Sequence, residues 1–97
     1  MIFIINAKKY DTDKMEMIAD VKKWYELEGA ARMIFGKGMG KVYDCHLWKS
    51  QKGNWLLTHD TDYKTVGEAI TESEAKDLLM KYNPDKYEEL FEEIPEA

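Results

Sequence analysis

The stretch from Val42 to Asp60 constrains the fold most, because it predicts a β-hairpin whose register follows from its turn. The turn, Ser50 to Asn54, has Gly53 where a type I turn followed by a left-handed bulge residue favours glycine. The cross-strand pairs that follow from this turn are Lys49 with Trp55, Trp48 with Leu56, Leu47 with Leu57, His46 with Thr58, and Cys45 with His59.

Side chains alternate across a strand, so the hairpin has two different faces. The better core face collects Tyr43, Cys45, Leu47, Trp55 and Leu57. The other face is mixed, and its pair Trp48 and Leu56 is either covered by a helix or offered to a partner. Trp48 is therefore a candidate partner-binding residue.

Short strands are predicted at the start of the chain. Residues 2–5 are apolar on both faces, and residues 9–11 return after a turn at residues 6–8. Residues 12–25 fit two patterns, since their apolar side chains recur at both strand and helix spacing. We favour a strand from about Glu16.

Helices are predicted in the middle and at the end of the chain. Residues 26–35 carry apolar side chains at helical spacing. Thr71 and Glu74 form a capping box that starts a second helix. Asn83 and Pro84 end that helix and start a third. The apolar face of the third helix is Tyr87, Leu90, Phe91 and Ile94.

Ninety-seven residues, 44% of them hydrophobic, make one globular domain. A short edge strand over residues 68–70 completes its sheet. The predicted fold is a single α+β domain over residues 1–97, with a mainly antiparallel sheet of four to six strands and a C-terminal helix pair packed on it. An exposed edge strand can pair with a second copy, so a homodimer is among the expected assemblies.

The residues that could carry chemistry lack the companions that the chemistry needs. The loop over residues 36–41, GKGMGK, lacks the earlier glycine and the following Ser or Thr of a phosphate loop. Cys45 and His59 are two soft ligands where zinc needs four, and no third group orients them as nucleophile and base. Residues 11–13 and 60–62 lack the glycine and glutamate of a calcium loop. We therefore expect no enzymatic activity, no cofactor and no metal site.

The net charge of −5 is concentrated at the C-terminal end. Residues 71–97 hold 9 acidic against 3 basic side chains, whereas residues 1–70 hold 10 against 11. Because phosphate binding needs cations, direct binding to nucleic acid is not expected, and a protein partner with a basic surface is. The predicted partner-binding residues on the last helix are Glu88, Glu89, Glu92 and Glu93.

The predicted compartment is the cytoplasm. A single cysteine, Cys45, excludes an internal disulfide framework and favours a reducing environment. The five apolar residues before Asn6 are too few for a secretory signal. No apolar run approaches the roughly 20 residues of a membrane span, so no membrane partner is expected.

Three stretches follow one another in a recognisable order: IINAKKYDTD (residues 4–13), LWKSQKGNWLL (47–57) and ITESEAKDLLMKYNPDKYEELFEE (70–93). Together they resemble a family of small proteins from Firmicutes phages, plasmids and integrated mobile elements. That family has Asn-Gly-Lys in its first turn, where this chain has Ala7. Residues 24–41 and 60–69 match nothing in the family.

The resemblance implies a mobile-element accessory protein of α+β fold, without catalytic residues, in the cytoplasm of a bacterial host. Small acidic proteins of that setting often inhibit host defence, CRISPR nucleases included, by occupying a basic nucleic-acid channel. The expected function is thus a non-enzymatic, protein-binding inhibitor of a host defence nuclease. The alternative is a small nucleic-acid-associated regulatory protein that uses Lys22, Lys23, Lys37 and Lys41.

Overall fold

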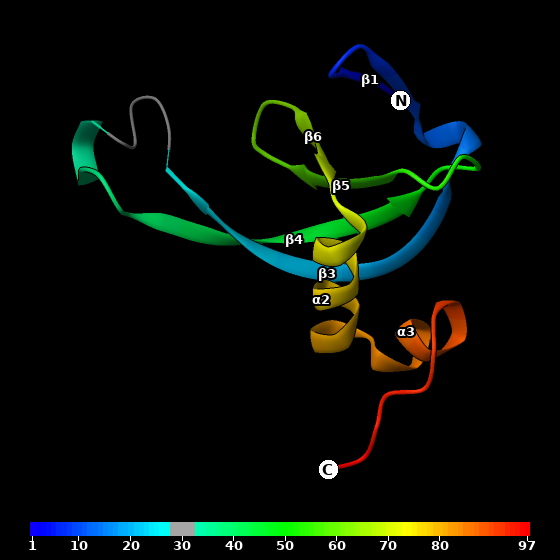
Figure 1. The fold of residues 1–97 in the computed structure, drawn as a ribbon. Coiled ribbons are helices and arrows are strands. Elements are labelled where there is room, and N and C mark those ends of the chain that lie inside the picture. Colours follow the sequence, from blue (N-terminus) through cyan, green and yellow to red (C-terminus); the bar gives the residue numbers. More distant parts are fainter. Residues whose placement is uncertain (28–32) are drawn as a thin grey trace.

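The computed structural model describes residues 1–27 and 33–97. Its elements in chain order are β1 (Ile2–Ile5), β2 (Lys8–Asp11), the 3-10 helix η1 (Thr12–Lys14), β3 (Glu16–Glu26), β4 (Gly40–Lys49), β5 (Trp55–Asp60), β6 (Thr65–Ile70), α2 (Glu72–Tyr82) and α3 (Pro84–Leu90). A four-stranded antiparallel sheet has the order β3-β4-β5-β6, and β1 pairs with β2 in a separate two-stranded sheet (Figure 1). The predicted α+β fold with C-terminal helices packed on an antiparallel sheet is confirmed.

The β4–β5 hairpin has the predicted register, with all the predicted pairs from Cys45–His59 to Lys49–Trp55. In its turn, the Ser50 N–H donates to the Asn54 carbonyl at 2.8 Å, and the Gly53 N–H donates to the Ser50 carbonyl at 3.0 Å. The φ angle of Gly53 is +86°, in the left-handed region where a side chain is strained. The turn glycine therefore has the conformation that the sequence predicted.

The segment that fitted both patterns is strand β3, which pairs along its whole length with β4. A β-bulge interrupts this pairing between Met17 and Ala19. Only part of β4 also pairs with β5, so the rest of the β3–β4 ribbon, residues 22–26 with 40–44, extends past the sheet as an arm (Figure 1). Among the described strands none pairs with the outer side of β3. Pairing of a second copy there stays a prediction.

The core lies between one face of the sheet and the two helices. Cys45, Leu47, Trp55 and Leu57 are buried, so four of the five predicted core residues of the hairpin are confirmed; the fifth, Tyr43, is half-buried. The same cluster includes Val21 from β3 and Ala75, Leu79 and Tyr87 from the helices. Burial of each large apolar side chain contributes about 1.5–3 kcal/mol.

The opposite face of the sheet is covered by the β1–β2 hairpin. Leu56 and Thr58 on that face are 0% and 4% exposed. Gly67 pairs with Thr58, and the Phe3 ring lies so close to Gly67 that a Cβ there would be 2.5 Å from a ring carbon. In Figure 1, β1 lies beyond β6, away from α2. We expected a helix or a partner to cover Leu56, but neither of them buries it.

Two predicted boundaries differ from the structure or fall outside it. Half of the helix predicted over residues 26–35, residues 28–32, lies outside the described part; Glu26 ends β3, and residues 33–35 are helical. Strand β6 begins at Thr65, earlier than the predicted strand over residues 68–70. Strand β6 is longer than predicted because it pairs with β5 along its whole length. The short apolar run over residues 68–70 did not indicate this pairing.

Both C-terminal helices are capped by the predicted residues. Thr71 Oγ1 accepts the Glu74 N–H at 3.1 Å and donates to Glu74 Oε1 at 3.3 Å. The Glu74 carboxylate thus meets the hydroxyl of Thr71, not its backbone N–H as in a full capping box. Asn83 Oδ1 accepts the Lys86 N–H at 3.2 Å, and Pro84 occupies the first helical position. In the described residues no helix is long and apolar enough to cross a membrane.

Candidate functional site

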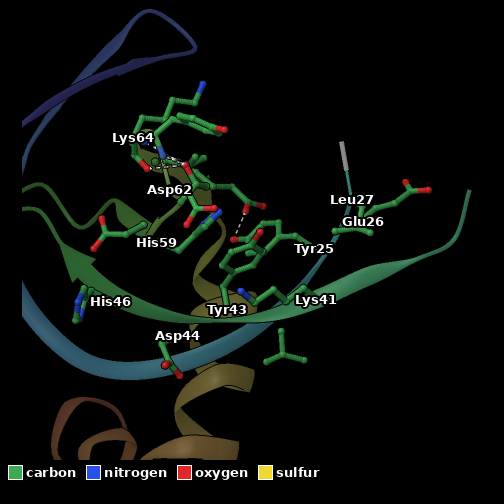
Figure 2. A pocket seen from close by; sticks show the side chains of 17 residues that line it. Tyr25, Glu26, Leu27, Lys41, Tyr43, Asp44, His46, His59, Asp62 and Lys64 are labelled. Carbon is green, nitrogen blue, oxygen red and sulfur yellow. Dashed lines mark hydrogen bonds between the residues drawn. The ribbon is translucent and has the colours of Figure 1, made fainter. Parts of the chain in front are cut away.

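Three rings gather where the arm leaves the sheet: Tyr25 of β3, Tyr43 of β4 and His59 of β5 (Figure 2). The imidazole of His59 stacks on Tyr25, with centroids 4.4 Å apart and 29° between planes. It also lies 4.7 Å from the Tyr43 centroid. Strand alternation places these rings on the same face as Cys45, which pairs with His59.

Glu68 of β6 ties this cluster together. Its Oε1 accepts from Lys23 Nζ at 2.8 Å, and its Oε2 accepts from Tyr25 Oη at 2.8 Å. Burial alone would raise the pKa of Glu68, but the hydrogen bonds from Lys23 and Tyr25 outweigh it and lower the pKa. Burial and the Glu68 carboxylate raise the pKa of Tyr25. Glu68 is therefore ionised and Tyr25 protonated at neutral pH.

Cys45 and His59 are neighbours, as predicted, but the environment holds both uncharged. Burial lowers the pKa of the His59 imidazole and raises the pKa of the Cys45 thiol. The Cys45 Sγ donates to the Tyr43 carbonyl at 3.4 Å. His59 Nδ1 is buried and has no hydrogen-bond partner in the described part of the chain. A protonated thiol is a poor nucleophile, so this pair is a packed part of the sheet.

The second histidine points the other way. His46 Nδ1 lies 2.6 Å from Asp20 Oδ1 on the opposite face, at the surface. Across residues 1–27 and 33–97, no three His, Cys, Asp or Glu side chains are grouped so that they could hold a metal ion.

An open hollow of about 960 Å³ lies between the base of the arm and the β5–β6 turn. Figure 2 shows Asp62 and Lys64 of the turn across the hollow from Lys41 and Tyr43. Thr61 Oγ1 closes the turn by donating to the Lys64 carbonyl at 3.0 Å and accepting the Lys64 N–H at 3.1 Å. The turn is thus closed by the Thr61 hydroxyl, and Asp60 ends β5. The walls of the hollow carry charges of both signs, so the hollow favours neither anions nor cations.

The arm also carries an exposed apolar pair. Trp24 and Val42 face each other across β3 and β4 and are 50% and 54% exposed. The indole of Trp24 lies over the backbone of Gly40, in the space that a side chain there would need. Tryptophan is among the side chains that are enriched at protein–protein interfaces.

The predicted partner-binding glutamates do not share one helix. Helix α3 ends at Leu90, so Glu88 and Glu89 lie on it while Glu92 and Glu93 follow it, and the prediction that all four lie on the last helix is wrong. Glutamates four residues apart repel one another, and carboxylates near a helix C-terminus oppose its dipole. Glu88 Oε2 instead accepts the Ile94 N–H at 2.9 Å and holds the turned chain.

Trp48 is less available to a partner than its position in the sequence suggests. Its indole is half-buried, and Nε1–H donates to Thr58 Oγ1 at 2.9 Å. Two of the four lysines of the alternative hypothesis, Lys22 and Lys23, are also engaged. Lys22 pairs with Asp44 at 3.4 Å and Lys23 with Glu68 at 2.8 Å. These lysines do not form a free basic patch.

The ring cluster was not predicted, although part of its signal was present. The hairpin register paired Cys45 with His59, and alternation put Tyr43 on the same face. Tyr25 and Glu68 could not be assigned to the cluster from the sequence, because the neighbours of β3 and β6 depend on long-range pairing. Comparisons with protein-family models, curated proteins and solved structures found no match.

Proposed function

We propose that this chain is a non-enzymatic protein-binding module that docks on a basic partner surface through an acidic C-terminal segment, residues 85–96. The segment holds six carboxylates and one lysine, Lys86. Charge of one sign on a small surface steers an oppositely charged partner and favours its correct orientation.

The observation that carries the proposal is the way this segment is fixed to the core. Phe91 and Ile94 pack against the buried cluster. The Phe91 ring lies 5.2 Å from the Tyr87 ring and 6.1 Å from the Trp55 ring. Because these apolar residues hold the chain in place, the charged side chains between them are presented from an ordered backbone. Such preorganisation reduces the entropy lost on binding.

The structure separates the four predicted glutamates into two pairs. Glu88 holds the Ile94 N–H, and Glu89 lies 3.1 Å from Lys86 Nζ. Glu92 and Glu93 are exposed and have neither a hydrogen bond nor an ion pair among the described residues. These two carboxylates carry the greatest share of the proposed contact, because no group of residues 1–27 and 33–97 neutralises them.

The partner class that we propose is a nucleic-acid-handling defence enzyme of a bacterial host, CRISPR nucleases included. Such an enzyme lines its channel with Lys and Arg, whose charge suits an acidic segment. The family resemblance supports a mobile-element origin for the chain. The exposed pair Trp24 and Val42 supports protein binding in general.

The test is capture from a nuclease-treated Firmicutes lysate on the immobilised chain, with the retained proteins identified by mass spectrometry. Wild type is expected to retain an enzyme with a basic channel, and heparin is expected to compete. Glu92→Lys with Glu93→Lys should reduce retention at least about tenfold, since each reversal removes an attraction and adds a repulsion. Both residues lie outside the helices, so folding is preserved.

The matched control is Glu16→Lys with Asp62→Lys. Both side chains are exposed, neither makes a hydrogen bond or ion pair among the described residues, and the net charge changes equally. This control should keep wild-type retention. Equal retention by the Glu92 and Glu93 variant, or equal loss in the control, would contradict docking through the acidic segment.

A further inference from the structure

A second charged surface lies near the N-terminus, in a hollow of about 600 Å³ between β2 and the β4–β5 turn. In Figure 1 the segment after β2 and this turn lie side by side. Three segments contribute lysines to the hollow: β2, η1 and the turn. The lysines are Lys8, Lys9, Lys14 and Lys52.

These charges are not neutralised within the described part of the chain. The ion pairs found there use Lys22, Lys23 and Lys86, not the four lysines of the hollow. Asp11 is the one carboxylate among the described lining residues, and its Oδ1 accepts the Asp13 N–H at 3.1 Å. A chain of net charge −5 therefore concentrates unpaired positive charge in one place.

We infer that this basic hollow binds phosphate groups of a single-stranded nucleic acid. Clustered ammonium groups repel one another, and an anion between them relieves that repulsion. Lysine binds phosphate as a point charge and needs no fixed fork geometry. Ser50, Gln51 and Asn54 add polar groups to the wall. The volume lies within the range of ligand sites.

The layout of the lysines favours a phosphate chain over an acidic peptide. Lys8 and Lys9 are adjacent on β2, so their side chains leave the strand on opposite sides. A peptide added as a strand beside β2 would face only one of them. A flexible single-stranded nucleic acid carries one charge per nucleotide and can reach both lysines. Tyr10 is 7% exposed and offers no stacking platform, so contacts to the backbone dominate and binding is independent of sequence.

This site uses different residues from the acidic segment and does not rest on the proposed function. The net charge of −5 predicted no nucleic-acid binding. That total combines the positive charge of the basic hollow with the negative charge of the acidic segment. Lys52 is also distant in sequence from the other three lysines, and the fold brings the β4–β5 turn beside the segment from β2 to η1. The chain could then contact a defence enzyme and its nucleic acid with separate surfaces.

The test is fluorescence anisotropy with a labelled single-stranded oligonucleotide of about 12 nucleotides and the intact chain. Four phosphate contacts, one for each lysine of the hollow, predict a slope near −2.8 of log affinity against log salt, which is roughly a 50-fold loss between about 50 and 200 mM salt. Lys14→Glu with Lys52→Glu should weaken binding at least about tenfold at the lower salt. Lys37→Glu with Lys64→Glu, of equal charge change outside this hollow, should stay within about threefold of wild type.

Three results would overturn the inference. The first is no binding at the lower salt. The second is an equal loss of affinity in both double variants, which would indicate a general effect of charge. The third is tighter binding of a poly-glutamate peptide of similar length than of the oligonucleotide, which would assign the hollow to an acidic protein. Circular dichroism of each variant verifies that the fold is intact.

Discussion

The turn between β1 and β2 contains a strained residue, Ala7. Ile5 pairs with Lys8, so Asn6 and Ala7 alone connect β1 to β2. Their φ angles are +52° and +61°, as a type I′ hairpin turn requires. Asparagine tolerates this region, but alanine places its Cβ against the following carbonyl, at a cost of about 1–2 kcal/mol.

Replacement of this alanine should stabilise the protein. Ala7→Gly removes the Cβ, and we expect the free energy of unfolding to rise by about 0.5–1 kcal/mol, because the greater entropy of the unfolded chain offsets part of the gain. Urea denaturation followed by tryptophan fluorescence measures it. Ala69→Gly is the control at an ordinary strand position, and it should be destabilising. Lower stability of Ala7→Gly would show that the turn is not strained.

His59 makes stability depend on pH. Burial holds its folded-state pKa below the ordinary value of 6.5, so the unfolded chain takes up the proton first as pH falls. Its contribution to stability is therefore complete above about pH 6.5 and is lost below it. Glu68, with a pKa lowered from 4.5, loses its contribution only in more acidic solution. The interval between these two values reports on His59.

His59→Phe should remove most of the decline in unfolding free energy between pH 6.5 and 4.5, since phenylalanine keeps an aromatic ring but binds no proton. Denaturation curves at several pH values measure the slope. Tyr43→Phe removes a hydroxyl from the same cluster, leaves the imidazole, and should keep the slope. An unchanged slope in His59→Phe would assign it to another group.

At the scale of elements, local chemistry predicted the hairpin and both helix starts. Gly53 fixes the β4–β5 register, and Thr71 and Asn83 cap their helices through their own side chains. The identity of β3 could not be predicted locally, because Met17 and Val21 fit both strand alternation and helical spacing. Pairing with β4 decides it. The end of α3 at Leu90 was missed because Phe91 and Ile94 keep helical spacing while they pack on the core from a turned chain.

The docking of the β1–β2 hairpin on the sheet was not foreseen, and it can be tested at Gly67. Gly67→Ala inserts a methyl group against the Phe3 ring, so it should cost about 1–3 kcal/mol of stability. In a Phe3→Ala background the same change should cost less than about 1 kcal/mol. A double-mutant cycle by denaturation gives the coupling. Additive effects would mean that Phe3 does not lie on Gly67.

At the scale of the molecule, the chain has two charged surfaces and an exposed arm. The sequence alone showed the acidic segment, because its six carboxylates lie within twelve residues of the chain. The basic hollow and the ring cluster around His59 could not be predicted, since each depends on strands that meet only in the folded protein. We propose that the acidic segment docks on a partner, because Glu92 and Glu93 are exposed and have neither a hydrogen bond nor an ion pair among the described residues.

The most direct measurement is zero-length cross-linking of carboxylates to amines on the captured complex, followed by mass spectrometry of the linked peptides. The expected result is that Glu92 and Glu93 link to lysines in a basic channel of the partner, and that heparin suppresses these links. A complex that forms normally, with links only to carboxylates outside residues 85–96, would contradict docking through the acidic segment.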